Sequence, residues 1–173
     1  MTLRVREATV DDAPRIAAIY NQGIEERIAT FETKARSEDD VRKWFDGVHP
    51  ICVAEDEGRV VAFAASSSYR PRECYAGIAE VSIYVERTAR KKGAGRAALQ
   101  GLLAACEQRG FWKLVSRVFV ENQASRALVR ASGFREVGTY EKHARLDGQW
   151  RDVVIVEKLI GALALSRDGE GRV

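Results

Sequence analysis

Two periodicities that follow one another in residues 79–107 constrain the fold more than any other feature of the chain. The stretch reads AEVSIYVERTARKKGAGRAALQGLLAACE. Val81, Ile83 and Val85 alternate with other side chains, which predicts a strand with two different faces. Apolar residues then recur at helical spacing, on one face of an amphipathic helix: Ala98, Leu99, Leu102, Leu103 and Cys106. The stretch therefore predicts a strand, a turn and a helix in direct succession.

The turn at residues 90–96, which we call the phosphate loop, has the composition of an anion-binding loop. Gly93 and Gly95 have no Cβ, so the backbone there can approach a ligand closely. The first amides of a helix lack internal partners and lie at the positive end of its dipole, which favours a phosphate. Basic side chains flank the glycines: Arg90, Lys91, Lys92 and Arg96. The loop lacks both the Walker A ending and a third glycine, so taken alone it also fits a basic, solvent-exposed turn.

The totals favour a single cytoplasmic domain. A chain of 173 residues with 46% hydrophobic residues can bury roughly 70% of its unfolded surface. The net charge of +3 is too small to indicate nucleic-acid binding, and no apolar run approaches the roughly 20 residues of a membrane span. Three cysteines without a C-x-x-C pair make disulfides or a zinc site improbable, so we expect no metal and a reducing cytoplasm.

The remaining pattern predicts an α/β (α+β) fold, in which a mostly antiparallel sheet of about seven strands is flanked by helices. Ser37 and Asp40 form a capping box for a helix that His49-Pro50 should end. Asp147-Gly148 is a strong hairpin signal between two long alternating strands. Residues 1–160 therefore form one domain, and residues 161–173 have little to bury and should fray. We expect strands over residues 3–8, 51–55, 60–66, 79–85, 112–120, 135–145 and 149–160.

The phosphate-loop region resembles motif A of the GNAT superfamily of acetyl-CoA-dependent N-acetyltransferases. Arg90, Gly93 and Gly95 match its R/Q-x-x-G-x-G/A pattern between a strand and a helix. Asn122-Gln-Ala-Ser125 followed by Gly-Phe is similar to motif B, and the order of elements over about residues 3–160 is the one that fold requires.

The resemblance implies that the co-substrate is acetyl-CoA. It implies that loop amides hold the pyrophosphate and that the end of the preceding strand holds the pantetheine arm. It also implies that this strand is splayed from its neighbour near Ile83, where a backbone N–H meets the oxyanion. The cofactor-binding residues implied are Ile83, Tyr84, Val85, Arg90, Lys91, Lys92, Gly93, Ala94, Gly95, Arg96, Asn122 and Ser125.

Other segments resemble the phosphinothricin acetyltransferase branch, whose relatives acetylate methionine sulfoximine or arsinothricin. "YRPRECYAG", "GFWKLVSR" and "YEKHARLDGQWRDV" are most similar to arsinothricin resistance enzymes, and Ala29-Thr30-Phe31 is a further match that implies Phe31 as a substrate contact. The resemblance implies acylation of the α-amine of a small anionic amino-acid antimetabolite. It also implies a homodimer in which the late strands help to complete the neighbour's pocket.

A substrate of this kind needs cations, and Arg70 and Arg72 offer two guanidinium groups. Each is suited to a bidentate oxyanion, and in an extended segment the two side chains point the same way. The alternative is that both are surface arginines paired with Glu73 or with solvent.

Acyl transfer to an amine also needs a base, because an α-ammonium group must first lose a proton. We expect Glu80 in that role, with a pKa raised by its apolar strand neighbours; a structural ion pair with an arginine is the alternative. Glu32 and His143 are weaker candidates. Many GNAT enzymes have a tyrosine where this chain has Val129, so no general acid is assigned; Tyr84 and Tyr140 qualify by residue type only.

Two other functions stay open. The first is a GNAT enzyme that acetylates a protein N-terminus or a polyamine, although a polyamine site would favour clustered acids over the arginines at 70 and 72. The second is a non-catalytic acyl-CoA sensor or an RNA-associated scaffold, for which Val129 is the only supporting feature.

Overall fold

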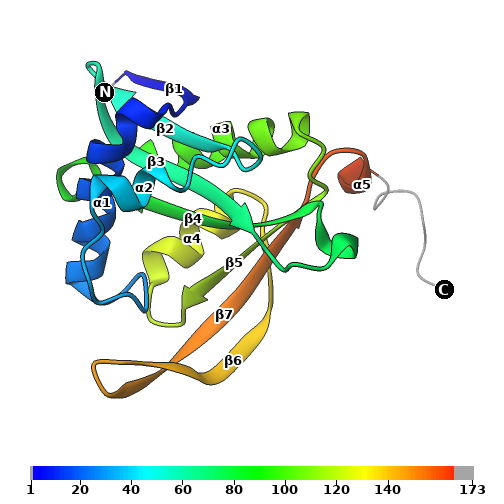
Figure 1. Ribbon diagram of the computed structural model, residues 1–173. Coiled ribbons are helices and arrows are strands. Elements are labelled where there is room, and N and C mark those ends of the chain that lie inside the picture. Colours follow the sequence, from blue (N-terminus) through cyan, green and yellow to red (C-terminus); the bar gives the residue numbers. More distant parts are fainter. Residues whose placement is uncertain (1, 166–173) are drawn as a thin grey trace.

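A seven-stranded sheet in the order β1-β2-β3-β4-β5-β7-β6 forms the centre of the molecule (Figure 1). The computed structural model describes residues 2–165. All neighbouring strands run antiparallel except β4 and β5, which run parallel. This confirms the predicted fold class. The strands are β1 (Leu3–Glu7), β2 (Ile51–Asp56), β3 (Arg59–Ser68), β4 (Ile78–Val85), β5 (Lys113–Phe119), β6 (Arg135–Leu146) and β7 (Gln149–Leu159).

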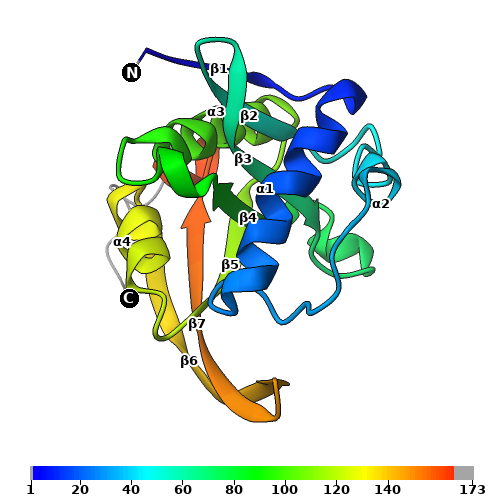
Figure 2. The ribbon, with the colours of Figure 1, turned by 90° about the vertical axis from the view of Figure 1, so that its left-hand side faces the viewer.

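Helices cover both faces of the sheet (Figures 1 and 2). On one face α3 (Ala94–Gln108) and α4 (Gln123–Ala131) bury an apolar cluster that includes Val81 of β4. On the other face α1 (Ala13–Glu26) and α2 (Glu38–Arg42) pack on a second cluster that includes Phe63 and, partly buried, Tyr84. Since side chains alternate along a strand, β4 sends Val81, Ile83 and Val85 towards α3, and Glu80, Ser82 and Tyr84 towards α1.

Several local predictions are confirmed. The Ser37 hydroxyl accepts a hydrogen bond from the Asp40 amide at 3.1 Å, which is the expected capping box. Asp147 and Gly148 both have positive φ, 50° and 77°, as a type I′ hairpin turn requires. The prediction that the α2 helix runs to His49-Pro50 is wrong, because α2 ends at Arg42. Trp44 and Phe45 reach the core from the following turns instead.

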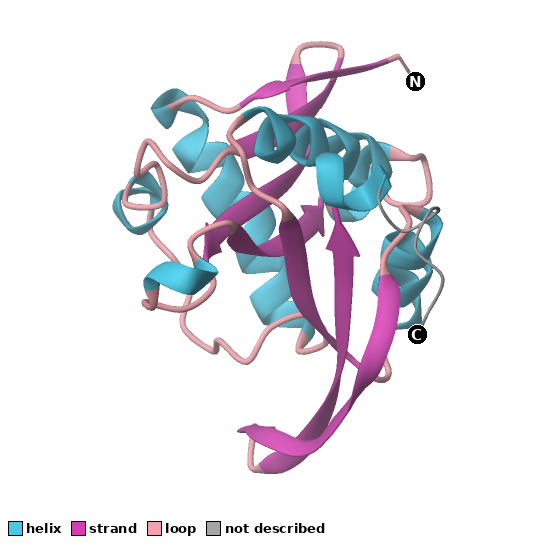
Figure 3. Cartoon of the chain, turned by 90° about the vertical axis from the view of Figure 1, so that its right-hand side faces the viewer, coloured by secondary structure: helices cyan, strands magenta, loops and turns pink. Residues whose placement is uncertain are grey.

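The two edges of the sheet differ in how far they extend beyond the helices. β1 lies at one edge, whereas the β6–β7 hairpin projects beyond the helices at the other (Figure 3). Short 3-10 turns connect elements at Val10–Asp12, Glu73–Tyr75 and Arg87–Ala89, and a last helix, α5, spans Ala162–Leu165. The predicted fraying at 161–173 thus gives way to a helical turn at its start, and its later part lies outside the described residues. In the described part of the chain no helix is long and apolar enough to cross a membrane.

Candidate active site

The parallel strands β4 and β5 separate part-way along their length. Within the described strands their pairing covers only Ile78–Glu80 opposite Lys113–Val115, although both strands continue beyond it. The hydroxyl of Ser116 donates a 2.7 Å hydrogen bond to the carbonyl of Val81, so that carbonyl faces β5. Backbone groups alternate in direction along a strand, and those of Ile83 therefore face the gap as well. The gap thus offers a backbone N–H where the sequence predicted an oxyanion contact.

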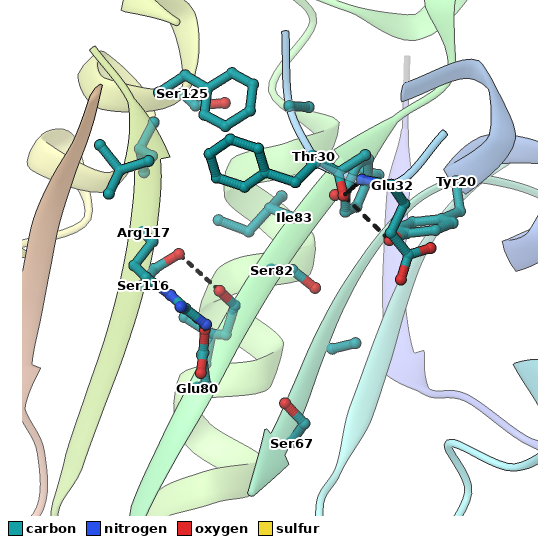
Figure 4. A pocket seen from close by; sticks show the side chains of 18 of the residues that line it. Tyr20, Thr30, Glu32, Ser67, Glu80, Ser82, Ile83, Ser116, Arg117 and Ser125 are labelled. Atoms are coloured by element: carbon teal, nitrogen blue, oxygen red, sulfur yellow. Dashed lines mark hydrogen bonds and ion pairs between the residues drawn. The ribbon is translucent and has the colours of Figure 1, made fainter. Parts of the chain in front are cut away.

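A cavity of about 720 Å³ occupies this gap, and residues from both faces of the sheet form its wall. Figure 4 shows several of them. The wall includes Ile83, Ser125 and Val129 from the α3–α4 side. It also includes Glu80, Tyr84, Phe31 and other residues from the α1–α2 side. The volume lies within the range of roughly 300–1,000 Å³ typical of small-molecule sites. One continuous space therefore joins the predicted cofactor side to the predicted acceptor side.

The phosphate loop leads into α3 as predicted. Gly93 has a left-handed φ of 87° and begins the helix without a side-chain cap, which leaves the first-turn amides available to an anion. Lys91 and Arg96 are exposed beside it. The guanidinium of Arg90 has two other partners: it donates to Glu26 of α1 at 2.8 Å and to the carbonyl of Val85 at 3.3 Å.

Gly95 has a packing role that the sequence did not predict. A Cβ at this position would lie 2.8 Å from Cγ2 of Val85 and 2.9 Å from Cδ1 of Leu128. The absent side chain therefore allows α3 to pack closely against β4 and α4. The predicted contact of Gly95 with the cofactor through the backbone stays a prediction.

Asn122 and Ser125, for which motif B implied contacts with the coenzyme, both line the cavity. The amide of Ser125 donates to Oδ1 of Asn122 at 3.1 Å, which confirms Asn122 as the cap of α4. The Nδ2 group of Asn122 donates to the carbonyl of Ile28 at 3.2 Å. Asn122 therefore joins the start of α4 to the loop that carries the acceptor side of the cavity.

Glu80 lines the cavity, and its carboxylate forms an ion pair with Arg117 of β5 (Figure 4). Nε of Arg117 donates to Oε1 of Glu80 at 3.0 Å, and Nη2 donates to the same oxygen. The ion pair that the sequence left open as an alternative is therefore present. Both partners of this ion pair line the cavity, so Glu80 remains a candidate base.

The two weaker base candidates also line the cavity. Nε of Arg36 donates to Glu32 at 2.7 Å, and this contact, opposed by desolvation, holds the pKa of the Glu32 carboxyl below its usual value. His143 lies on β6, next to a break in the β6–β7 register, with its ring 6.5 Å from that of Phe31. A lowered pKa makes Glu32 a poorer proton acceptor.

The predicted substrate contacts occupy different places. Phe31 lines the cavity and packs edge-to-face on Phe119, with ring centroids 4.7 Å apart. Arg70 and Arg72 are exposed and are not part of the cavity wall; the Arg70 guanidinium lies over the Tyr69 ring at 5.1 Å. The segment that carries both arginines, residues 69–72, begins two residues after Ser67, and Ser67 does line the cavity.

The two tyrosines that could serve as a general acid differ in burial and in their position relative to the cavity. Burial raises the pKa of the Tyr84 hydroxyl, so it holds its proton more tightly than a free phenol. Tyr140 is 51% exposed and does not line the cavity. Val129 is buried in the cavity wall at the position where many GNAT enzymes have tyrosine.

Sequence reasoning missed Arg117 and Ser116, which carry the contacts across the gap. Both lie in the segment LVSRVF, which reads as an ordinary buried strand. Only the parallel pairing of Glu80 with Val115 shows that residues 116 and 117 face the gap.

Comparison with known proteins agrees with this geometry. Residues 16–134 match the model of the Acetyltransferase (GNAT) family. The chain belongs to this family. It is an N-acetyltransferase that uses acetyl-CoA. The uncapped α3 start and the basic loop fit the coenzyme's phosphates. Within residues 2–165 no group of three His, Cys, Asp or Glu side chains could hold a metal ion.

Several of the similar proteins carry names from one branch of the family, and one solved structure carries a different name: the ribosomal-protein-alanine N-acetyltransferase from Brucella melitensis has a TM-score of 0.86 and 32% identity, and covers 91% of this chain and 99% of that one. Phosphinothricin N-acetyltransferase of Alcaligenes faecalis is 32% identical over 91% of this chain and 83% of its own length. L-methionine sulfoximine/L-methionine sulfone acetyltransferase of Pseudomonas aeruginosa is 32% identical over 91% of this chain and 94% of its own length. The structure of a phosphinothricin acetyltransferase from Sinorhizobium meliloti in complex with AcCoA has a TM-score of 0.86 and 32% identity, and covers 93% of this chain and 90% of that one.

Proposed function

We propose that this enzyme acetylates the α-amine of a small anionic amino-acid antimetabolite of the phosphinothricin, arsinothricin or methionine sulfoximine type. The observation that carries the proposal is the cavity at the β4–β5 gap, whose wall includes Ile83 and Ser125 together with Glu80, Arg117 and Phe31. The names of the similar enzymes support the same substrate class. A cytoplasmic location is part of the proposal, and free thiols at Cys52, Cys74 and Cys106 support it.

The mechanism is direct transfer. Glu80 takes one proton from the α-ammonium group, and the neutral nitrogen attacks the thioester carbonyl. The N–H of Ile83 donates to the carbonyl oxygen as it becomes negative, and donors of this kind contribute about 3–4 kcal/mol. The C–S bond then breaks, the acetyl group remains on nitrogen, and the sulfur leaves as a thiolate, which is tolerable because thiols are modest acids. The nitrogen then loses its second proton, which converts the thiolate into the free thiol. Each turnover releases one free thiol and one net proton.

A substrate panel tests the proposal. Phosphinothricin, arsinothricin and methionine sulfoximine are each incubated with acetyl-CoA, and thiol release is measured. We expect saturable release with at least one of them. Release with basic peptides or polyamines and none with these amino acids would favour the alternative acceptors. No release with any amine, together with polyanion binding that weakens steeply with salt, would favour a scaffold.

Arg70 and Arg72 are proposed to grip the side-chain oxyanion at the mouth of the cavity. We expect Arg72→Ala to raise KM for phosphinothricin about tenfold, since a hydrogen bond to a charged group contributes roughly 1.5 kcal/mol or more. KM for a neutral amine should stay unchanged. Arg4→Ala removes an exposed arginine of β1 and serves as the control. Equal losses for anionic and neutral amines in Arg72→Ala would contradict the clamp.

A homodimer through the β6–β7 hairpin completes the proposal. The hairpin exposes Val137, Tyr140 and Trp150 by 48%, 51% and 51%, and β6 has no strand on its outer edge within the described sheet. A second copy of the chain would cover these side chains. We expect the wild type to sediment as a dimer and Trp150→Glu to shift it towards monomer. A monomeric wild type at the concentrations used for assay would remove this part of the proposal.

A further inference from the structure

We propose that Arg117 binds the α-carboxylate of the amino-acid substrate and thereby releases Glu80 to act as the base. This inference rests on the proposed function and deepens it. Before the substrate binds, the guanidinium holds the Glu80 carboxylate; with substrate present, it exchanges that partner for the substrate's own carboxylate. Arg117 is then both a specificity residue and a switch for the base.

The first argument is the spacing of charges. In an α-amino acid the ammonium and the carboxylate are bonded to the same carbon atom, so their partners in a protein must also be neighbours. Glu80 and Arg117 are in direct contact, and both line the cavity. A carboxylate that faces the ammonium and a guanidinium that faces the carboxylate therefore match a zwitterion in one orientation. Neither Arg70 nor Arg72 stands next to Glu80 in this way.

The second argument is the donor capacity of Arg117. A guanidinium has five N–H groups, and those seen on Glu80 are one each from Nε and Nη2. Its side chain is 50% exposed, so the remaining donors can reach an incoming ligand. A planar guanidinium also suits the two oxygens of a carboxylate. If Arg117 takes the α-carboxylate, Arg70 and Arg72 are left for the phosphinate, arsinate or sulfoximine end.

The third argument is that Arg117 is the best-placed cation of the cavity wall to bind the α-carboxylate of the substrate. Besides Arg117, the lysine or arginine side chain that the described residues place in the wall is that of Lys43, which is 76% exposed and lies 3.5 Å from Asp40. The titratable and charged groups that share the wall with Glu80 come from several elements. They are Arg117 from β5, Glu32 from the loop after α1, Lys43 and Asp46 after α2, Tyr20 from α1, Tyr84 from β4 and His143 from β6.

The exchange has a consequence for the base. Two N–H groups of Arg117 occupy Oε1 of Glu80, an oxygen that would otherwise be open to the substrate's ammonium group. When the substrate's carboxylate draws the guanidinium away, this oxygen is free to accept a proton from the ammonium group beside it. A substrate without the carboxylate leaves the ion pair intact. Removing the α-carboxylate from the substrate should therefore lower kcat as well as raise KM.

The test compares phosphinothricin with its α-carboxamide. Both carry the same amine and phosphinate, and only the first carries the α-carboxylate. Thiol release from acetyl-CoA is measured with the wild type, Arg117→Gln, Arg117→Lys and Arg109→Gln. Arg109→Gln breaks an ion pair with Glu7 that does not involve the cavity wall. We expect the wild type to prefer the acid at least tenfold in kcat/KM, with part of the preference in kcat.

In Arg117→Gln the preference should fall at least tenfold, mainly through loss of activity on the acid. Activity on the carboxamide should persist, which shows that the variant is folded. Arg117→Lys should recover part of the preference, and Arg109→Gln should keep all of it. An unchanged acid-to-amide ratio in Arg117→Gln overturns the inference, and so does a wild type that acetylates both compounds equally, whatever the variants do. Absence of thiol release with either compound and with the rest of the panel overturns the proposed function itself.

Discussion

Replacing Glu80 with glutamine is expected to lower kcat by about a hundred- to ten-thousand-fold, the usual contribution of a general base. Glutamine keeps the size of the side chain and can still accept a hydrogen bond from Arg117, so the strand pairing of β4 should survive. Acetyl-CoA binding should be unchanged, because the phosphate loop lies elsewhere on the chain. The measurement is steady-state thiol release across pH. Without the carboxylate the α-ammonium group must lose its proton to solvent, so the deficit of Glu80→Gln should be largest at neutral pH and should shrink as the pH rises towards the pKa of the amine.

Two further variants make the result specific. Glu157→Gln alters another strand carboxylate that is paired with an arginine, Arg135, but does not line the main cavity. It should keep wild-type kcat. Glu32→Gln alters the competing carboxylate of the wall, whose pKa is held low by Arg36, and we expect a much smaller effect than in Glu80→Gln. A Glu80→Gln enzyme that retains wild-type kcat over the whole pH range would show that another group, or water alone, deprotonates the amine.

The sequence predicted those parts of the molecule that depend on neighbours along the chain. The hairpin turn at Asp147-Gly148, the cap at Asn122 and the helix that begins after Gly93 follow from a few adjacent residues each. Their conformations are set by local backbone preferences, which a single sequence contains. The element order then follows from the alternation of apolar residues.

The parts that the residues themselves do not predict depend on which distant segments meet. The separation of β4 from β5 was expected from the family resemblance alone, because no residue within either strand signals it. The ion pair of Glu80 with Arg117 joins positions 37 residues apart, and that of Arg90 with Glu26 joins positions 64 apart. An alternating strand pattern gives the face of a side chain but not its partner. The candidate base was therefore predictable as a residue, whereas the arginine beside it was not.

Replacing Gly93 with valine is expected to weaken acetyl-CoA binding at least a hundredfold. Gly93 has φ 87°, a conformation that costs an ordinary residue roughly 1–2 kcal/mol and is least tolerable for a β-branched one. No atom outside the turn lies within 4 Å of an added Cβ, so the effect comes from the backbone and not from a clash. The turn can relieve the strain only by shifting, which moves the first amides of α3. Losing two charge-assisted hydrogen bonds to phosphate costs about 3 kcal/mol or more.

The opposite end of the same helix supplies a matched control. Gly110 follows α3 with φ 83° and also has no atom within 4 Å of an added Cβ, so Gly110→Val imposes a similar strain. Both variants should therefore lose a similar amount of stability, which thermal unfolding measures. Only Gly93→Val should raise the dissociation constant of acetyl-CoA, measured by calorimetry below both melting temperatures. Equal affinities in the two variants would mean that the start of α3 does not hold the pyrophosphate, and the cofactor assignment of residues 90–96 would fall with it.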